Sequence, residues 1–85
     1  MTVEFSNKAL KQISKLDKVI QTRIFDFMAD VAKLENPRSR GKPLVGNLIG
    51  LWRYRVGDYR ILCKIKDEQL IITVVEIGHR SKVYD

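Results

Sequence analysis

The feature that most constrains this chain is a two-residue turn, Gly57-Asp58, between two segments of alternating character. Glycine accepts the positive φ that the first position of such a turn requires, so this pattern is typical of a tight β-hairpin. Leu51–Val56 and Tyr59–Lys66 are therefore predicted to be antiparallel strands. Because a two-residue loop fixes which residues lie opposite each other, the turn also predicts the register of the hairpin.

The predicted register gives the hairpin two faces of different chemistry. The first face is apolar and aromatic and should pack on helices; its residues are Trp52, Tyr54, Val56, Tyr59, Ile61, Cys63 and Ile65. The second face is basic; its residues are Leu51, Arg53, Arg55, Arg60, Leu62 and Lys64. Arg55 lies opposite Arg60 on the basic face, and like charges across a strand pair destabilise a sheet by up to about 1 kcal/mol.

Folding alone does not favour opposed arginines, so we interpret the basic face as a binding surface. Guanidinium groups bind phosphate in a planar, two-pronged way, and clustered cations stabilise the charge of a reacting phosphodiester. The alternative is that the arginines extend into solvent and lay their stems along neighbouring leucines. Residues 36–66 hold eight of the basic residues against one acidic residue, within a net charge of +6. This concentration favours a polyanion as partner.

Two amphipathic helices are predicted ahead of the hairpin. Ser6 is a suitable N-cap for the first, whose apolar residues recur at helical spacing. Asp17 can cap the second, and Phe27 and Met28 belong to its apolar stripe, which we interpret as core. Asn36-Pro37 should end this helix, because the residue before proline is disfavoured in the helical region. A long loop, residues 36–50, follows. Its basic residues, which we expect to bind the polyanion, are Arg38, Arg40 and Lys42.

Strands are expected at both ends of the chain. Thr2–Phe5 alternates as a short strand, and Leu70–Ile77 is nearly all apolar, as in a strand covered on both faces. Gly78 should break the last strand. The order strand, helix, helix and three strands predicts an α+β fold, with a helical hairpin packed on an antiparallel sheet of about four strands. We expect a single domain spanning residues 1–85.

The composition limits the kinds of site that this chain can form. Cys63 is the only cysteine, so no internal disulfide forms, and it is interpreted as a small buried hydrophobe. No apolar run approaches the about 18–20 residues of a membrane span, and no signal peptide is recognisable, so a cytoplasmic protein is expected. Carboxylates are scarce near the basic face and His79 is the only histidine, so neither a metal site nor a histidine pair is predicted, and no cofactor is expected. His79 can transfer protons near neutral pH, although a structural role is the alternative.

Two segments carry a family resemblance. The run from Gly50 to Ile61 resembles the central hairpin of RelE/ParE proteins. The run from Val75 to Tyr84 resembles the C-terminal motif of the RelE branch, in which a glycine is followed by an arginine and then a tyrosine. The resemblance covers nearly the whole chain. It implies a toxin that cleaves messenger RNA in the decoding site of the ribosome and is held silent by an antitoxin.

The resemblance also implies residue roles. Arg60 would stabilise the phosphate charge, Arg80 would clamp the phosphate or protonate the leaving oxygen, and Tyr84 would stack on, or help position, the flipped nucleotide. The RNA strand would be bound by Lys64, Arg38, Arg40 and Lys42. The alternatives are an ion pair of Arg80 with Glu76 and packing of Tyr84 against the sheet.

The sequence departs from the best-known RelE members at two positions. Arg53 and Arg55 stand where those members carry lysines, and arginine effectively cannot take up a proton. The general base is therefore open: Lys64, Tyr84 or His79 would serve, or the protein relies on positioning and charge stabilisation. Two other functions stay open, a non-enzymatic ParE-like inhibitor of DNA gyrase and a catalytically weak RNA-binding member. An acidic, partly disordered antitoxin is expected as partner under either toxin reading.

Overall fold

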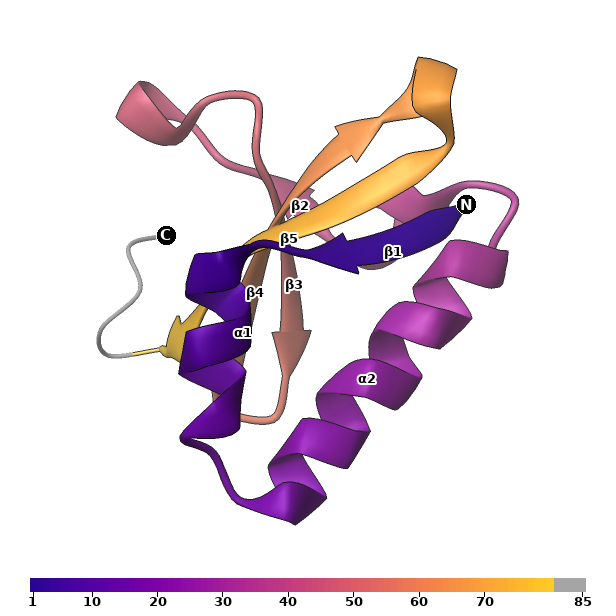
Figure 1. Ribbon diagram of the computed structural model, residues 1–85. Helices are drawn as coiled ribbons and strands as arrows, with labels where there is room; N and C mark the ends of the chain where they lie inside the picture. Colours follow the sequence, from indigo (N-terminus) through magenta and orange to yellow (C-terminus); the bar gives the residue numbers. More distant parts are fainter. Residues whose placement is uncertain (81–85) are drawn as a thin grey trace.

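The computed structural model describes residues 1–80, in which two helices pack on a mixed sheet of five strands (Figure 1). In chain order the elements are β1 (Thr2–Phe5), α1 (Asn7–Ser14), α2 (Lys18–Lys33), η1 (Pro37–Arg40), β2 (Lys42–Pro43), η2 (Gly46–Leu48), β3 (Trp52–Val56), β4 (Tyr59–Lys66), η3 (Asp67–Gln69) and β5 (Ile71–His79). The strands lie in the order β1-β5-β4-β3-β2. The predicted α+β class, a helical hairpin on a sheet, is confirmed.

The sheet differs from the expectation in two respects. β1 pairs with β5 in parallel, from Thr2 opposite Ile71 to Phe5 opposite Val74, so the sheet is mixed rather than antiparallel. Only antiparallel neighbours can be joined by a tight turn, and no such turn links β1 to β5, so local sequence left their relative direction open. The second difference is β2, a two-residue edge strand that the long loop adds to β3.

The helices follow their local signals closely. The Ser6 hydroxyl accepts a hydrogen bond from the Ala9 amide at 3.1 Å, as expected of an N-cap. Asp17 stands at the N-cap of α2, but its carboxylate caps no backbone amide among residues 1–80. The second helix ends at Lys33, a few residues before the predicted break at Asn36-Pro37. None of the helices in the described part of the chain is long and apolar enough to cross a membrane.

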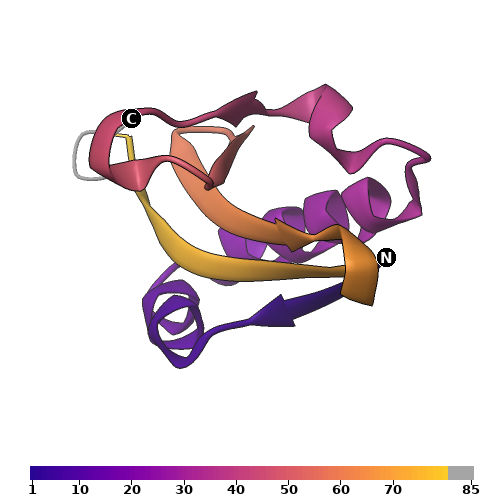
Figure 2. The ribbon, with the colours of Figure 1, turned by 90° about the horizontal axis from the view of Figure 1, so that it is seen from above.

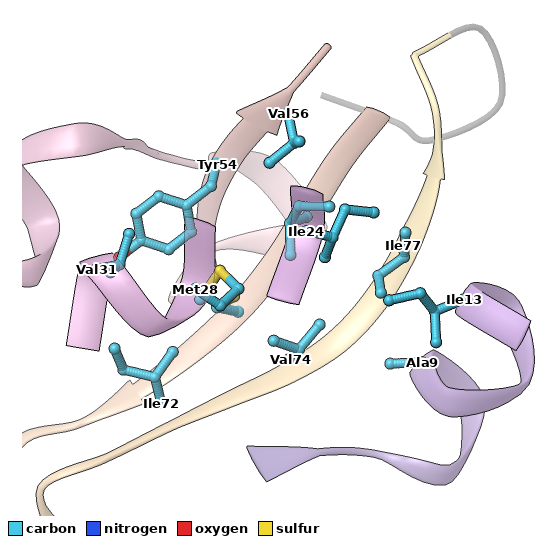
Figure 3. Close-up of a cluster of buried hydrophobic side chains, with 12 residues drawn as sticks. Ala9, Ile13, Ile24, Met28, Val31, Tyr54, Val56, Ile72, Val74 and Ile77 are labelled. Carbon is cyan, nitrogen blue, oxygen red and sulfur yellow. The ribbon is translucent and has the colours of Figure 1, made fainter. Parts of the chain in front are cut away.

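The main core lies between the helices and the inner face of the sheet (Figure 3). Its buried residues are Ala9, Ile13, Ile24, Met28, Val31, Tyr54, Val56, Ile61, Cys63, Ile72, Val74 and Ile77. Tyr54 is fully buried, and its hydroxyl donates a 2.7 Å hydrogen bond to the carbonyl oxygen of Pro37. Burial raises the pKa of the Cys63 thiol, so this cysteine is the inert core residue that the sequence predicted.

A second, smaller core lies on the outer face of the sheet. Its members are the buried Leu44 and Leu62, with Leu48, Leu51 and Val75 packed against them. Figure 2 shows the segment 44–51 on the far side of the sheet from α1. A register shift between β4 and β5 leaves Val75 as an extra residue, a β-bulge, so Val74 and Ile77 both reach the main core. Side chains of β5 therefore reach both cores, with Val75 on the outer face, in agreement with its apolar sequence.

Candidate nucleic-acid interface

The hairpin has the predicted register. The pairs run from Trp52 opposite Cys63 to Val56 opposite Tyr59, with Arg55 opposite Arg60. Gly57 adopts a φ of 58°, and Asp58 does not share this positive φ, so the turn is of the glycine-first type. The residues of the apolar face are all in the main core or packed against it, which confirms that face.

Three cations of the basic face, Arg53, Arg55 and Arg60, border two adjoining hollows, which together we call the basic groove. The larger hollow has a volume of about 440 Å³; it is lined by Phe27, Ser39, Arg40, Gly41, Lys42, Arg53 and Arg55. The smaller hollow has a volume of about 70 Å³; it is lined by Arg55, Gly57, Asp58, Tyr59, Arg60 and Arg80. Arg55 belongs to both hollows. The fold thus brings six of the predicted site residues together from the long loop, the hairpin and the end of β5.

The basic loop is held against β3 by backbone pairing and close packing. In the β2–β3 ladder, Lys42 lies opposite Arg53. Gly41 comes so near to β3 that a Cβ at this position would lie 2.5 Å from the carbonyl oxygen of Arg53 and 2.6 Å from the Trp52 ring. Only glycine allows this approach without displacing the strand or the ring. The cations of the loop and of β3 therefore form two walls of one hollow.

Arg38 is engaged elsewhere. Both of its terminal nitrogens donate 2.8 Å hydrogen bonds to the two carboxylate oxygens of Asp67, and its guanidinium lies 5.9 Å from the centre of the Trp52 ring. This fork-shaped pair raises the pKa of Arg38 and lowers the pKa of Asp67. Arg38 lines neither hollow of the basic groove but forms a clamp between η1 and the start of η3. Its predicted contact with RNA stays a prediction.

Arg80 lies beside the hairpin turn. Its amide donates a 2.8 Å hydrogen bond to the carbonyl oxygen of Asp58, and its Nε is 4.0 Å from a carboxylate oxygen of the same residue. Glu76, which the sequence offered as its ion-pair partner, instead accepts a 2.7 Å hydrogen bond from Lys8. That proposed pairing is wrong, because β5 carries Arg80 past the hairpin turn to Asp58, whereas Glu76 lies further back, opposite Leu62. The side-chain contact with Asp58 is long and exposed and contributes little, so the backbone hydrogen bond is what keeps Arg80 beside the smaller hollow that it lines.

His79 lines neither hollow of the basic groove. Gly78 does not end the last strand as predicted; it pairs with Arg60, and β5 continues to His79. A strand needs only extended backbone, which glycine adopts where a neighbouring strand pairs with it. The imidazole contacts the Tyr59 ring edge to face at 5.6 Å between ring centres. Because Tyr59 packs against the main core, His79 is on the helix side of the sheet, and its catalytic role stays a prediction.

The remaining candidates are Lys64 and Tyr84. Lys64 is exposed further along β4, opposite Thr73, and lines neither hollow. Tyr84 lies outside the described residues. Neither assignment is tested by the geometry of residues 1–80.

Three residues of the larger hollow were not identified from the sequence as site residues. Phe27 was interpreted as core; it does pack against the core, yet it also lines the hollow. Ser39 donates to the carbonyl oxygen of Asn36 at 2.8 Å and so shapes η1. Gly41 had one signal in the sequence, namely a glycine between two cations in a loop of unusual length. Its closeness to Trp52 depends on the path of the loop, which no local pattern specified.

Comparisons with known proteins agree with this geometry. Residues 3–84 match the family model described as the ParE toxin of the type II toxin-antitoxin system parDE. The chain is 32% identical over 84 residues to the toxin RelG of Mycobacterium tuberculosis, covering 98% of this chain and 94% of that protein. It superposes with a TM-score of 0.84, at 32% identity, on a chain of the RelBE2 toxin-antitoxin complex of the same organism, covering 95% of this chain and 92% of that one. A chain of the Escherichia coli RelBE complex, at 16% identity and a TM-score of 0.73, covering 92% and 94%, shares the fold.

The fold and these matches define a toxin of a type II toxin-antitoxin system. The chain belongs to the ParE toxin family, within the RelE/ParE superfamily. Members of this superfamily differ in activity, so the membership leaves the reaction to be argued from the site.

Proposed function

We propose that this toxin is a ribosome-dependent endoribonuclease that cleaves messenger RNA in the decoding site and so inhibits translation. The observation that carries the proposal is the basic groove, in which cations from the loop, both hairpin strands and the end of β5 converge. A groove lined by arginines from separate elements fits the backbone of a single RNA strand, whose phosphates dominate affinity. The chemistry proposed here uses no metal ion and no cofactor.

In the proposed reaction the ribose 2′-oxygen attacks the adjacent phosphorus. A bond forms between these two atoms, the bond from phosphorus to the 5′-oxygen breaks, and the products are a 2′,3′-cyclic phosphate and a free 5′-hydroxyl. We assign to Arg60 and Arg80 the role of stabilising the charge on the non-bridging oxygens, which is supported by their both lining the smaller hollow. Arg80 would also hydrogen-bond the departing 5′-oxygen, which takes up a proton from water.

The proton of the 2′-hydroxyl needs an acceptor. The arginines of the groove stay protonated and cannot serve as bases. Lys64, His79 and Tyr84 remain the candidates for this role. If none of them is required, the reaction depends on holding the 2′-oxygen in line with the leaving oxygen, an effect of positioning.

Primer extension on messages from a translating extract tests the proposal. The wild-type toxin should create new 5′ ends at codons in the decoding site, and the Arg60→Ala/Arg80→Ala variant should not. The matched control is Lys11→Ala/Lys15→Ala, which removes the same charge from exposed positions on α1 and at its C-cap and should cut like the wild type. Equal cutting by the Arg60→Ala/Arg80→Ala variant would refute the assigned roles.

We also propose a cognate antitoxin as partner, because the relatives with this fold include toxins solved in toxin-antitoxin complexes. An acidic segment is the natural complement of the basic groove. Binding of the antitoxin should therefore weaken as the salt concentration rises. Binding that does not change between low and high salt would argue against an electrostatic contribution.

The second candidate function is inhibition of DNA gyrase without catalysis. The observation that favours it is the matching family model, whose description names the ParE toxin of a type II toxin-antitoxin system. A supercoiling assay with purified gyrase separates the two functions. Growth arrest with intact messages and inhibited supercoiling would replace the nuclease proposal by this one.

A further inference from the structure

Phe27 occupies an unusual place for a core residue of α2. It is half-buried, and it lines the larger hollow of the basic groove on one side. On its other side lies a further hollow of about 370 Å³ between α2 and the hairpin; it is lined by Arg23, Asp26, Phe27, Asp30, Arg55, Val56 and Gly57. Phe27 therefore forms a partition between two hollows along the α2–β3 side of the molecule.

The ring of Phe27 is held by its neighbours. It contacts the Tyr54 ring edge to face, with 5.8 Å between ring centres and 65° between the planes. Tyr54 is itself fully buried and tied through its hydroxyl to the carbonyl oxygen of Pro37. Because the supporting residue cannot move freely, Phe27 presents a fixed apolar surface, which lowers the entropy cost of binding a ligand against it.

The charges on the two sides of Phe27 differ. The loop side holds Arg40, Lys42 and Arg53 and no acidic residue among its lining residues. The other side holds Asp26 and Asp30 together with two arginines. A phosphate is thus favoured on the loop side of the ring, and a neutral, planar group is favoured on the ring itself.

We propose that the larger hollow binds one unstacked nucleotide of single-stranded RNA, with its base against Phe27 and its phosphate toward Arg40 and Lys42; this rests on the proposed function and deepens it. Every nucleobase has a π-face, so an aromatic wall beside a cationic wall selects single strands without requiring a sequence. The volume of about 440 Å³ lies within the roughly 300–1,000 Å³ of small-ligand sites. Arg55 lines both hollows, so it connects this nucleotide subsite to the smaller hollow, which Arg60 and Arg80 also line.

Fluorescence anisotropy of the purified toxin with a short labelled RNA tests the subsite directly, without the ribosome. The informative variant is Phe27→Leu, which keeps an apolar side chain against Tyr54 but removes the ring. Stacking is worth about 1–3 kcal/mol per base, so the dissociation constant should rise about 5- to 150-fold. Phe27→Tyr should bind like the wild type, and thermal melting of each variant confirms that it is folded.

A matched RNA with abasic positions separates stacking from a merely structural role. It keeps the phosphates and lacks the bases, so Phe27→Leu should bind it as the wild type does. Equal losses on normal and abasic RNA would mean that Phe27 only shapes the cationic wall, and would overturn the proposal. An unchanged affinity for RNA, with a weaker affinity for the antitoxin, would make the hollow a protein-binding site and would also overturn it.

The outcomes separate this inference from the nuclease proposal. If messages are cut by the wild type and RNA affinity is insensitive to Phe27→Leu, the nuclease stands and the subsite fails. If RNA affinity depends on the ring but no message is cut, the subsite stands as an RNA-binding site and the nuclease fails.

Discussion

Replacing Gly41 by alanine tests how the basic loop is positioned on the sheet. The new Cβ would lie 2.5 Å from the Arg53 carbonyl oxygen and 2.6 Å from the Trp52 ring, so either the loop or β3 must shift. Overpacking of this kind costs about 1–3 kcal/mol. In a chain of 85 residues each kcal/mol corresponds to about 4–8 °C in Tm, so Gly41→Ala should melt roughly 4–24 °C below the wild type.

Urea denaturation in two backgrounds identifies the cause of that loss. Trp52→Leu removes the ring that the new Cβ would meet. Gly41→Ala should therefore lower the free energy of unfolding less in the Trp52→Leu protein than in the wild type. Part of the loss should persist, because the contact with the Arg53 carbonyl oxygen remains. Gly46→Ala is the comparison, because Gly46 has no neighbour within 4 Å and a φ of 68°. Its cost comes from the backbone conformation and should be equal in both backgrounds. A Gly41→Ala variant within about 0.5 kcal/mol of the wild type, the usual range for a neutral surface change, would refute the reasoning.

Three further predictions concern the supports of the groove. Tyr54→Phe leaves the carbonyl oxygen of Pro37 without its buried hydrogen bond and should lower the free energy of unfolding by about 1–3 kcal/mol, measured by urea denaturation; no loss would show that solvent replaces the bond. The Arg38 guanidinium lowers the pKa of Asp67, so the clamp stabilises the fold above the unfolded-state pKa of about 3.9, and this stabilisation is lost as the pH falls through the lower folded pKa. The difference in Tm between the wild type and Asp67→Asn should therefore be present at pH 7 and vanish in strong acid. A difference in Tm that does not change with pH would contradict a stabilising role of this ion pair. Lys42→Ala should reduce the slope of log affinity for single-stranded RNA against log salt by about 0.7, and an unchanged slope would place this lysine outside the phosphate path.

The hairpin and its chemistry could be predicted from sequence because a tight turn is a local device. Gly57-Asp58 fixed which residue lies opposite which, so the opposed pair of Arg55 and Arg60 was predictable without any knowledge of the fold. The N-cap at Ser6 was predictable for the same reason, since an N-cap hydrogen bond spans only a few residues. Gly78 shows the limit of local reasoning: its pairing with Arg60 keeps it in β5 although glycine alone suggests a break.

Which other segments lie next to the basic face was decided only by the tertiary structure. The path of the long loop over β3 depends on contacts between residues far apart in sequence, such as the clamp between Arg38 and Asp67. The same contacts place Lys42 opposite Arg53. The helical pattern assigned Phe27 to the core, but its second surface is visible only once the loop and α2 form the walls of a hollow. Sequence therefore determined the cations and their order on the hairpin, whereas long-range packing determined which of them share a site, because such packing has no signature in a local window.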